Sequence, residues 1–357
     1  MRRLTRVLIA PASAVALALA AALATLTLTQ WQPAERERVA VTRATNPAAL
    51  GPTVRLLTWN LGYAALDAQT DFFMDGGRMS RARSRPAVEH NLQAAIALLR
   101  KAGPDVALLQ ELDDKARRSF CVPERTTLLA AFPELSFAFA TNYSVPFVPV
   151  PLTDPMGGVT SGIATLTRAT PIEATSLALP GRFPWPNRLF NLKRVVLVTR
   201  LQIPSARSLV VANVHLSAFD KGGALRRQEL AFLRRLLLDE RRRGSLVIAG
   251  GDWNSTLPGA PLQPCPAGHD DLSWLVPLPG DWTPPGWRWV VDPVRPTVRT
   301  LGAPLNERTT CFAGIDGFLV SPGIEVESVA VVPTGFANSD HLPVQASVRL
   351  PQVAGRT

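Results

Sequence analysis

Short runs of apolar and β-branched residues recur along the chain and predict buried strands. Two longer stretches, residues 86–101 and 223–243, carry leucine, isoleucine and alanine at helical spacing and predict helices. The predicted strands cover residues 53–60, 105–111, 163–167, 194–201, 209–215, 245–249, 315–320 and 344–350. The chain shows no internal repeat and no change of composition after residue 53. We therefore predict one α/β domain over residues 53–350, followed by a short tail of residues 351–357.

The N-terminal segment has a different pattern. Arg2, Arg3 and Arg6 precede residues 7–29, which contain no charged side chain. This pattern predicts that residues 1–30 are a signal peptide or a membrane anchor, and the sequence does not separate the two. In either case we expect export, with the domain periplasmic, secreted or held on the outer side of the cytoplasmic membrane. The proline-containing residues 31–52 are predicted to be a linker.

Composition adds few constraints. The 357 residues carry a formal net charge of +10, and 46% of them are hydrophobic, which is enough for a large core. A basic surface favours anionic partners such as nucleic acid, lipid headgroups or phosphate esters, but it does not choose among them. Cys121, Cys265 and Cys311 allow one disulfide outside the cytoplasm or three free thiols.

Candidate chemistry begins after the predicted strand at residues 245–249. Gly250 and Gly251 allow the backbone to turn and to approach a ligand closely, and Asp252 and Asn254 follow them. In an extended backbone, positions i and i+2 point the same way, so we expect both side chains to face one site. A carboxylate beside an amide suits a base that activates water next to a group that holds an oxyanion. An ordinary loop entry is the alternative interpretation.

Other polar residues also stand at the ends of predicted strands, where α/β enzymes bind their ligands. The full set is Asn60, Glu111, His215, Asp252, Asn254, Asp340 and His341. Oxygen and nitrogen side chains of this kind suit a hard cation such as Mg²⁺. The sequence contains no HExxH pattern, which would have indicated zinc.

Six motifs, five of which contain these residues, resemble those of the endonuclease/exonuclease/phosphatase superfamily, which includes deoxyribonuclease I. In chain order the motifs are TWN (ending at Asn60), LQE (Glu111), NVH (His215), GGDWN (Asn254), IDGFLVS (Ser321) and NSDH (His341). The resemblance spans residues 53–350. It implies a four-layer sandwich, in which two packed and mainly antiparallel β-sheets are flanked by helices. It also implies metal-dependent hydrolysis of a phosphoester.

The resemblance assigns a metal-binding role to Glu111, with Asn60 nearby and Asp340 in the metal cluster or beside it. The implied metal is Mg²⁺, with Mn²⁺ or Ca²⁺ as alternatives.

The catalytic roles also follow from the resemblance. Asp252 would orient or deprotonate the attacking water, while Asn254 and His215 would hold the non-bridging oxygens. His341 would contact the phosphate or transfer a proton, and the carboxylate of Asp316 would orient its ring and favour its protonated form.

The sequence leaves the substrate open. We predict a phosphodiester hydrolase acting outside the cytoplasm on nucleic acid or on a phospholipid headgroup, with no protein partner indicated. A phosphomonoesterase of the same fold and an inactive module that binds a phosphate ligand are the alternatives. The tryptophans between residues 274 and 289 could contact a membrane, stack on bases or simply pack together. An insert at residues 71–77 is either a substrate loop or a surface loop.

Overall fold

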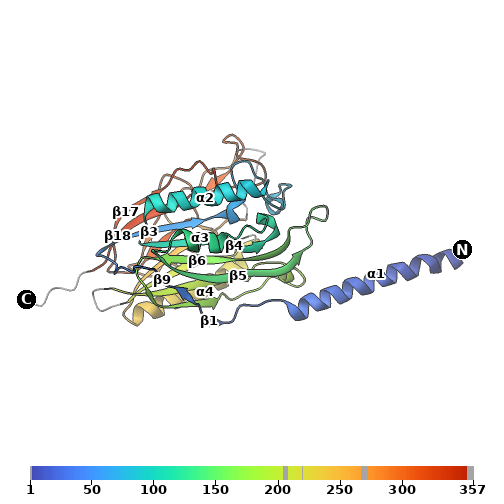
Figure 1. Cartoon of the computed structure of the whole chain (residues 1–357), viewed down its shortest axis with the longest axis horizontal. Coiled ribbons are helices and arrows are strands. Elements are labelled where there is room, and N and C mark those ends of the chain that lie inside the picture. The colour runs from blue at the N-terminus through green and yellow to red at the C-terminus, as the bar shows by residue number, and fades with distance from the viewer. Residues whose placement is uncertain (1, 204–207, 219, 267–271, 273, 352–357) are drawn as a thin grey trace, which may run out of the picture.

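The computed structural model describes residues 2–203, 208–218, 220–266, 272 and 274–351 (Figure 1). Two seven-stranded sheets pack face to face. In spatial order, the first sheet contains β1 (Arg36–Arg38), β7 (Pro171–Ala178), β8 (Val195–Gln202), β9 (Ser208–His215), β10 (Leu246–Asp252), β16 (Asp316–Val320) and β13 (Arg288–Val290). The second sheet contains β17 (Glu325–Val331), β18 (Val344–Arg349), β3 (Thr53–Asn60), β4 (Val106–Ala116), β6 (Gly157–Thr167), β5 (Ser136–Val148) and β2 (Val41–Thr42).

One parallel pair interrupts each antiparallel sheet, and it lies at the strands that carry the candidate site. These pairs are β9–β10 in the first sheet and β3–β4 in the second. Shorter strands pair outside the two sheets: β11 (Ser255–Thr256) with β12 (Val276–Pro277), and β14 (Val298–Arg299) with β15 (Phe312–Ala313). The predicted architecture of two packed, mainly antiparallel sheets is confirmed.

Helices cover the outer faces. Helix α2 (Arg85–Ala102) packs on the second sheet together with α3 (Glu124–Ala131), and α4 (Ala224–Arg242) packs on the first (Figure 1). The Ser84 side chain accepts from the Ala87 backbone N–H and caps α2, and Gly103 ends it at φ 53°. The short 3₁₀ helices are η1 (Gly62–Ala64), η2 (Phe73–Asp75), η3 (Arg117–Ser119), η4 (Asn187–Leu189) and η5 (Lys221–Gly223).

The apolar strand residues form the core between the sheets. Leu56, Leu108, Val211, Ile248 and Phe318 meet there, and none of them is more than 2% exposed. The tryptophans of the later loops mostly pack together: Trp282 and Trp289 lie edge-on to Trp253 in the core under α4. Of the three interpretations of these tryptophans (membrane contact, base stacking and packing), the structure favours packing.

Residues 31–52 are attached to the domain, although the sequence predicts a linker. Strand β1 pairs with β7 at the edge of the first sheet, and β2 pairs with β5 at the edge of the second. The physical reason is that an edge strand presents unpaired N–H and C=O groups, which a passing segment can satisfy.

Helix α1 (Arg2–Thr29) extends away from the domain (Figure 1). Trp185 Nε1 donates to Thr27 Oγ1 over 3.1 Å, which connects the end of α1 to the loop after β7. No helix in the described part of the chain is long and apolar enough to cross a membrane. Signal peptide or anchor therefore stays a prediction.

The structure pairs Cys265 with Cys311 in a disulfide and leaves Cys121 exposed as a free thiol. The sequence alone left this pairing open.

Candidate active site

The register of the first sheet brings three predicted site residues side by side. Asp252, at the end of β10, pairs with His215 at the end of β9 and with Asp316 at the start of β16. Because neighbouring strands lie about 4.8 Å apart, this register alone places the imidazole and both carboxylates in one cluster. All three residues are buried.

The second sheet contributes Asn60 and Glu111 from its parallel pair. Asn60 Nδ2 donates to Glu111 Oε1 over 3.2 Å and to Asp252 Oδ2 over 3.0 Å, so this amide joins the two sheets across the site. Glu111 lies at a break in the β4–β6 register, with φ at 53°. A bulge re-aims a side chain, and positive φ in a glutamate is uncommon, which is typical of a functional position.

Asn254 reaches the site by a route other than the one we expected. It adopts φ 47°, so the extended i, i+2 geometry does not apply. Its backbone N–H donates to Asp252 Oδ1 over 2.9 Å, and its Nδ2 donates to the Leu216 carbonyl over 2.8 Å. Gly251 approaches the neighbouring strand rather than a ligand, because a Cβ on it would lie 1.9 Å from the Val214 carbonyl oxygen.

His341 and Asp316 form the pair that the resemblance implied. His341 Nδ1 lies 2.8 Å from Asp316 Oδ2. Burial opposes protonation, but the Asp316 and Asp252 carboxylates raise the pKa of His341 well above its usual value. The protonated ring therefore has its Nε2–H free to donate on the side facing Asp252, whose Oδ2 is 3.8 Å away.

His215 has the opposite character. Burial lowers its pKa well below the usual value, and the positive charges of Arg194 and His341 lower it further. Its Nε2 lies 3.4 Å from Asp252 Oδ2 and 3.7 Å from Glu111 Oε1. A neutral imidazole here donates through Nε2 only, since its Nδ1 is buried without a hydrogen-bond partner among the described residues.

The site concentrates acidic groups that would fit a divalent cation. Burial raises the pKa of Asp252, and repulsion from Asp316 contributes in the same direction. Burial also raises the pKa of Asp340 to about 6, and the charge of Glu111 adds to this. Carboxylates whose ionised forms repel one another are stabilised by a bound cation.

Two arrangements of ligands are available to such a cation. Ligand atoms of Asp252, Asp316 and His341 all lie within 4.8 Å of one another. Because Nδ1 of His341 is already hydrogen-bonded to Asp316, we favour Glu111, which lines the cavity and has Asn60 beside it. Asp340, which also lines the cavity, stays the predicted further ligand.

A cavity of about 360 Å³ opens beside these residues and makes the cluster accessible. Glu111, His215, Asp252, Asn254, Asp340 and His341 all line it. The insert at residues 71–77 supplies part of the wall through Phe72, Phe73 and Met74, which favours the substrate-loop interpretation. Asp71 Oδ1 accepts from the backbone N–H groups of Arg78 and Met79 and so closes this loop.

Sequence reasoning missed the buried polar groups that support the site. Gln110 Nε2 donates to Asn213 Oδ1 over 2.8 Å and links the two sheets beneath the cluster. Arg194 lines the cavity, although the sequence shows it only as the first residue of a predicted strand. The position of Gln110 within the LQE motif was a usable signal, whereas nothing around Arg194 in the sequence indicates that it faces the site.

The family model for the endonuclease/exonuclease/phosphatase family matches residues 57–341. The chain belongs to this family. The family's hydrolases act on phosphoester bonds and typically depend on a divalent metal, which agrees with the concentration of acids in the site. A comparison with curated proteins found no match.

Solved structures show the same fold. An endonuclease/exonuclease/phosphatase from Beutenbergia cavernae aligns with TM-score 0.55 and 19% identity, covering 84% of this chain and 72% of that one. ANGEL2, a 2′,3′-cyclic phosphatase, aligns with TM-score 0.53 and 14% identity, covering 88% of this chain and 98% of its own. The human Nocturnin catalytic domain with bound sulfate aligns with TM-score 0.51 and 14% identity, with the same two coverages of 88% and 98%.

Proposed function

We propose that this family member is a divalent-metal-dependent phosphodiester hydrolase that acts outside the cytoplasm on a phospholipid. The observation that carries the reaction class is the convergence of Asp252, Asn254 and His341 with Glu111 at one cavity. A cation held by Glu111 would neutralise phosphate charge and favour attack on phosphorus.

Different residues of the site would then accept and donate the protons of the reaction. Asp252 is positioned to accept a proton from the attacking water while the oxygen of that water bonds to phosphorus. The bond from phosphorus to the leaving oxygen breaks, and protonated His341 is positioned to supply that oxygen with a proton. Asn254 keeps one Nδ2 hydrogen free for a non-bridging oxygen, because only the other is used by Leu216.

An apolar rim at the cavity supports a lipid substrate. We define the apolar rim as Met74, Phe147, Val150, Leu152 and Trp185, which are between 43% and 86% exposed. Met74 and Val150 also line the cavity itself. Exposed apolar side chains grouped at a cavity indicate a surface that contacts another apolar phase.

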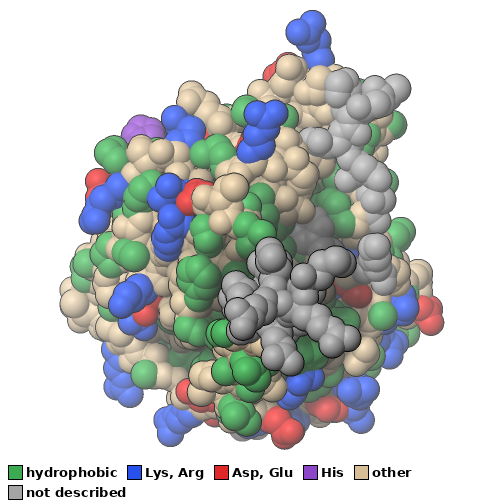
Figure 2. All heavy atoms as spheres, turned by 90° about the vertical axis from the view of Figure 1, so that its right-hand side faces the viewer, with side chains coloured by type: hydrophobic (Ala, Val, Ile, Leu, Met, Phe, Trp, Pro, Cys, Tyr) green, Lys and Arg blue, Asp and Glu red, His purple; other side chains and the backbone are tan. Residues whose placement is uncertain are grey.

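Trp185 of the apolar rim lies at the end of the domain from which α1 projects, since its Nε1 donates to Thr27 Oγ1 of that helix (Figure 1). Figure 2 looks onto this end and shows apolar side chains gathered on the face, with Lys and Arg side chains spread around them. Apolar side chains within a basic surface suit an anionic membrane, where both features contribute to binding. The uncharged residues 7–29 would hold the domain close to such a surface.

The test compares vesicle hydrolysis with plasmid nicking by the full-length chain. We expect Mg²⁺-dependent release of headgroup or phosphorylated headgroup from phospholipid vesicles, lost in chelator and in Asp252→Ala. Nicking of supercoiled plasmid with the same two controls, and no vesicle hydrolysis, would instead make the protein a nuclease. Hydrolysis that survives Asp252→Ala would refute the assigned base.

A further inference from the structure

Unpartnered hydrogen-bond donors line the cavity. The side-chain atoms Tyr63 Oη, Asn142 Nδ2 and Arg194 Nη1 are buried and have no hydrogen-bond partner within the described part of the chain. All three residues line the cavity that holds the candidate site. Because a buried donor without a partner is unfavourable, three of them at one cavity indicate acceptors supplied by a ligand.

Two of these donors come from segments of different sheets that meet: Asn142 lies on β5, and Arg194 directly precedes β8. The backbone N–H of Lys193, which precedes Arg194, donates to the Asn142 carbonyl over 2.8 Å. Arg194 lines both the catalytic cavity and a second, smaller pocket, as does Ser217. The guanidinium of Arg194 therefore lies in the wall between the two.

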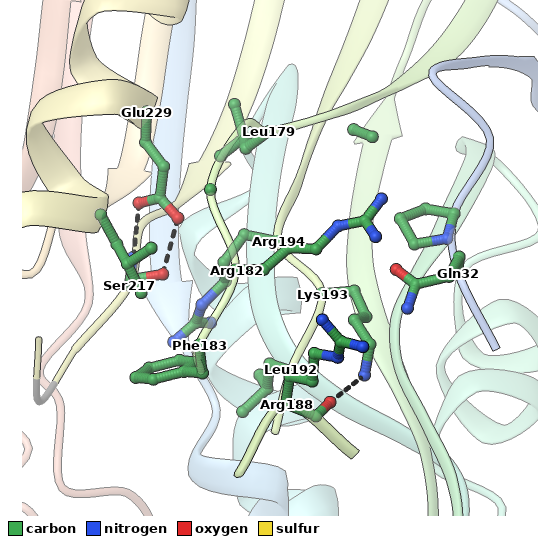
Figure 3. A pocket seen from close by; sticks show the side chains of 14 residues that line it. Gln32, Leu179, Arg182, Phe183, Arg188, Leu192, Lys193, Arg194, Ser217 and Glu229 are labelled. Atoms are coloured by element: carbon green, nitrogen blue, oxygen red, sulfur yellow. Dashed lines mark hydrogen bonds between the residues drawn. The ribbon is translucent and has the colours of Figure 1, made fainter. Parts of the chain in front are cut away.

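The smaller pocket is strongly basic (Figure 3). We call Arg182, Arg188, Lys193 and Arg194 the cationic pocket. Lys193 Nζ donates to the carbonyl oxygens of Arg188 and Asn191, over 2.8 and 3.0 Å, so its hydrogen bonds do not neutralise its charge. Burial and the charges of Arg182 and Arg188 lower the pKa of Lys193 to about 8.

One acid, Glu229, also lines the smaller pocket. Its carboxylate accepts from the Ser217 backbone N–H over 2.8 Å and from Ser217 Oγ over 2.6 Å, as Figure 3 shows. The charge of Glu229 partly offsets that of Arg194. The cations of this pocket thus outnumber its acids, which is the balance expected of a site for an anion.

We propose that Arg194 and Asn142, with the cationic pocket behind them, bind a second phosphate group of the substrate. This inference rests on the proposed function, since it places the second group beside the phosphate that is hydrolysed. The acids Glu111, Asp252 and Asp340 are on the part of the cavity that would hold the cation and the scissile phosphate. A phosphate presents three acceptor oxygens, which suits a guanidinium and an amide that both lack partners.

The experiment that tests this proposal uses pairs of phosphodiesters in which one member carries an additional phosphate group. The soluble pair is the p-nitrophenyl ester of thymidine 5′-phosphate and the same ester carrying a 3′-phosphate. The lipid pair is phosphatidylglycerol and cardiolipin in phosphatidylcholine vesicles. We expect wild type to prefer the doubly phosphorylated member by about ten- to hundredfold in kcat/KM, the effect of one or two charge-assisted hydrogen bonds. A preference in the soluble pair alone would identify a nucleotide source, and one in the lipid pair a lipid source.

Arg194→Gln should lower kcat/KM about ten- to hundredfold more for the doubly phosphorylated member than for the singly phosphorylated one and so abolish the preference, and Arg194→Lys should restore part of it. Arg235→Gln removes the same charge from the exposed face of α4 and should leave the preference unchanged. A loss of rate in Arg194→Gln that is equal for both members would overturn the proposal, because Arg194 would then only offset the acids. Absence of any preference in wild type would overturn it as well.

A binding measurement separates this proposal from the proposed function. Inorganic pyrophosphate titrated calorimetrically into the full-length Asp252→Asn chain, in chelator, tests the cationic pocket without catalysis. We expect binding that weakens at least about tenfold in the double variant with Arg194→Gln. If the wild type hydrolyses no substrate but pyrophosphate still binds, the proposed function is refuted and the second phosphate site is retained. If pyrophosphate binds the double variant as tightly as it binds Asp252→Asn, the second phosphate site is refuted.

Discussion

Replacing Asp252 by asparagine is expected to make the protein inactive and more stable at the same time. Asp252 is 2% exposed, and burial together with repulsion from Asp316 raises the pKa of its carboxyl. Asparagine has nearly the same shape and can still accept from the Asn254 backbone N–H. The amide NH2 of the asparagine would replace Asp252 Oδ2, which accepts from Asn60 Nδ2 over 3.0 Å, so Asn60 would keep only Glu111 Oε1 as an acceptor, and the lost hydrogen bond offsets part of the gain. We therefore expect a gain of about 1–3 kcal/mol in the free energy of unfolding in chelator.

The free energy of unfolding should depend on pH in a direction that follows from the raised pKa of Asp252. A carboxyl with a raised pKa keeps its proton in the folded protein when the unfolded chain has already released one. That contribution to stability is lost as the pH rises from 3.8, the ordinary value, through the raised pKa of the folded state. The difference in stability between Asp252→Asn and wild type should accordingly widen as the pH rises.

Denaturant unfolding in chelator at several pH values measures this difference, and hydrolysis with Mg²⁺ measures activity. Loss of the base should lower kcat by at least about 10²-fold. Each kcal/mol should raise the melting temperature by about 2–4 °C. A variant that is less stable than wild type at neutral pH, or a difference that does not change with pH, would show that the buried carboxylate is not destabilising.

Three further predictions follow from the rest of the structure. Trp253→Leu, in the core under α4, should lower the free energy of unfolding by about 2–4 kcal/mol in a denaturant titration, and a loss below 1 kcal/mol would contradict the packing. Cys265→Ala with Cys311→Ala should lower stability by about 2–4 kcal/mol, as should reductant on wild type; equal melting curves would contradict the pairing. The preference for a doubly phosphorylated substrate should decline as the pH rises through about 8, because Lys193 loses its charge while the arginines of the pocket keep theirs; a flat pH profile of the kcat/KM ratio would exclude Lys193.

Much of the fold was accessible from the sequence because strands that are buried on both faces leave continuous apolar runs. The runs at residues 209–215 and 245–249 match β9 and β10. The arrangement of two packed sheets flanked by helices came from the family resemblance. Register was not accessible. The pairing of Asp252 with both His215 and Asp316 depends on tertiary packing, which no local pattern encodes.

The local conformations at the site were also beyond the sequence. Glu111 and Asn254 both adopt positive φ, which local propensity argues against for a glutamate and which the surrounding sheet imposes. The insert at residues 71–77 contains two aspartates and two glycines, which are typical of a surface loop. Its aromatic residues nevertheless form part of the cavity wall, because the cavity offers them apolar contacts.

Acids and unpartnered donors line the same cavity, and this combination predicts how its ligands bind. Glu111 and Asp340 repel each other until a cation is bound, while Arg194 and Asn142 lack acceptors until an anion is bound. Each ligand alone neutralises one part and leaves the other unsatisfied, and a cation and a phosphate also attract each other directly.

Mg²⁺ and inorganic phosphate should therefore bind cooperatively, with a coupling free energy of about 1–3 kcal/mol. Calorimetric titration of phosphate into the full-length chain with and without Mg²⁺ measures this coupling, and titration in the opposite order must return the same value. Glu111→Gln removes one of the repelling charges and should reduce the coupling, whereas Arg235→Gln should not change it. Independent binding of the two ligands would mean that the acids and the donors do not serve a common substrate.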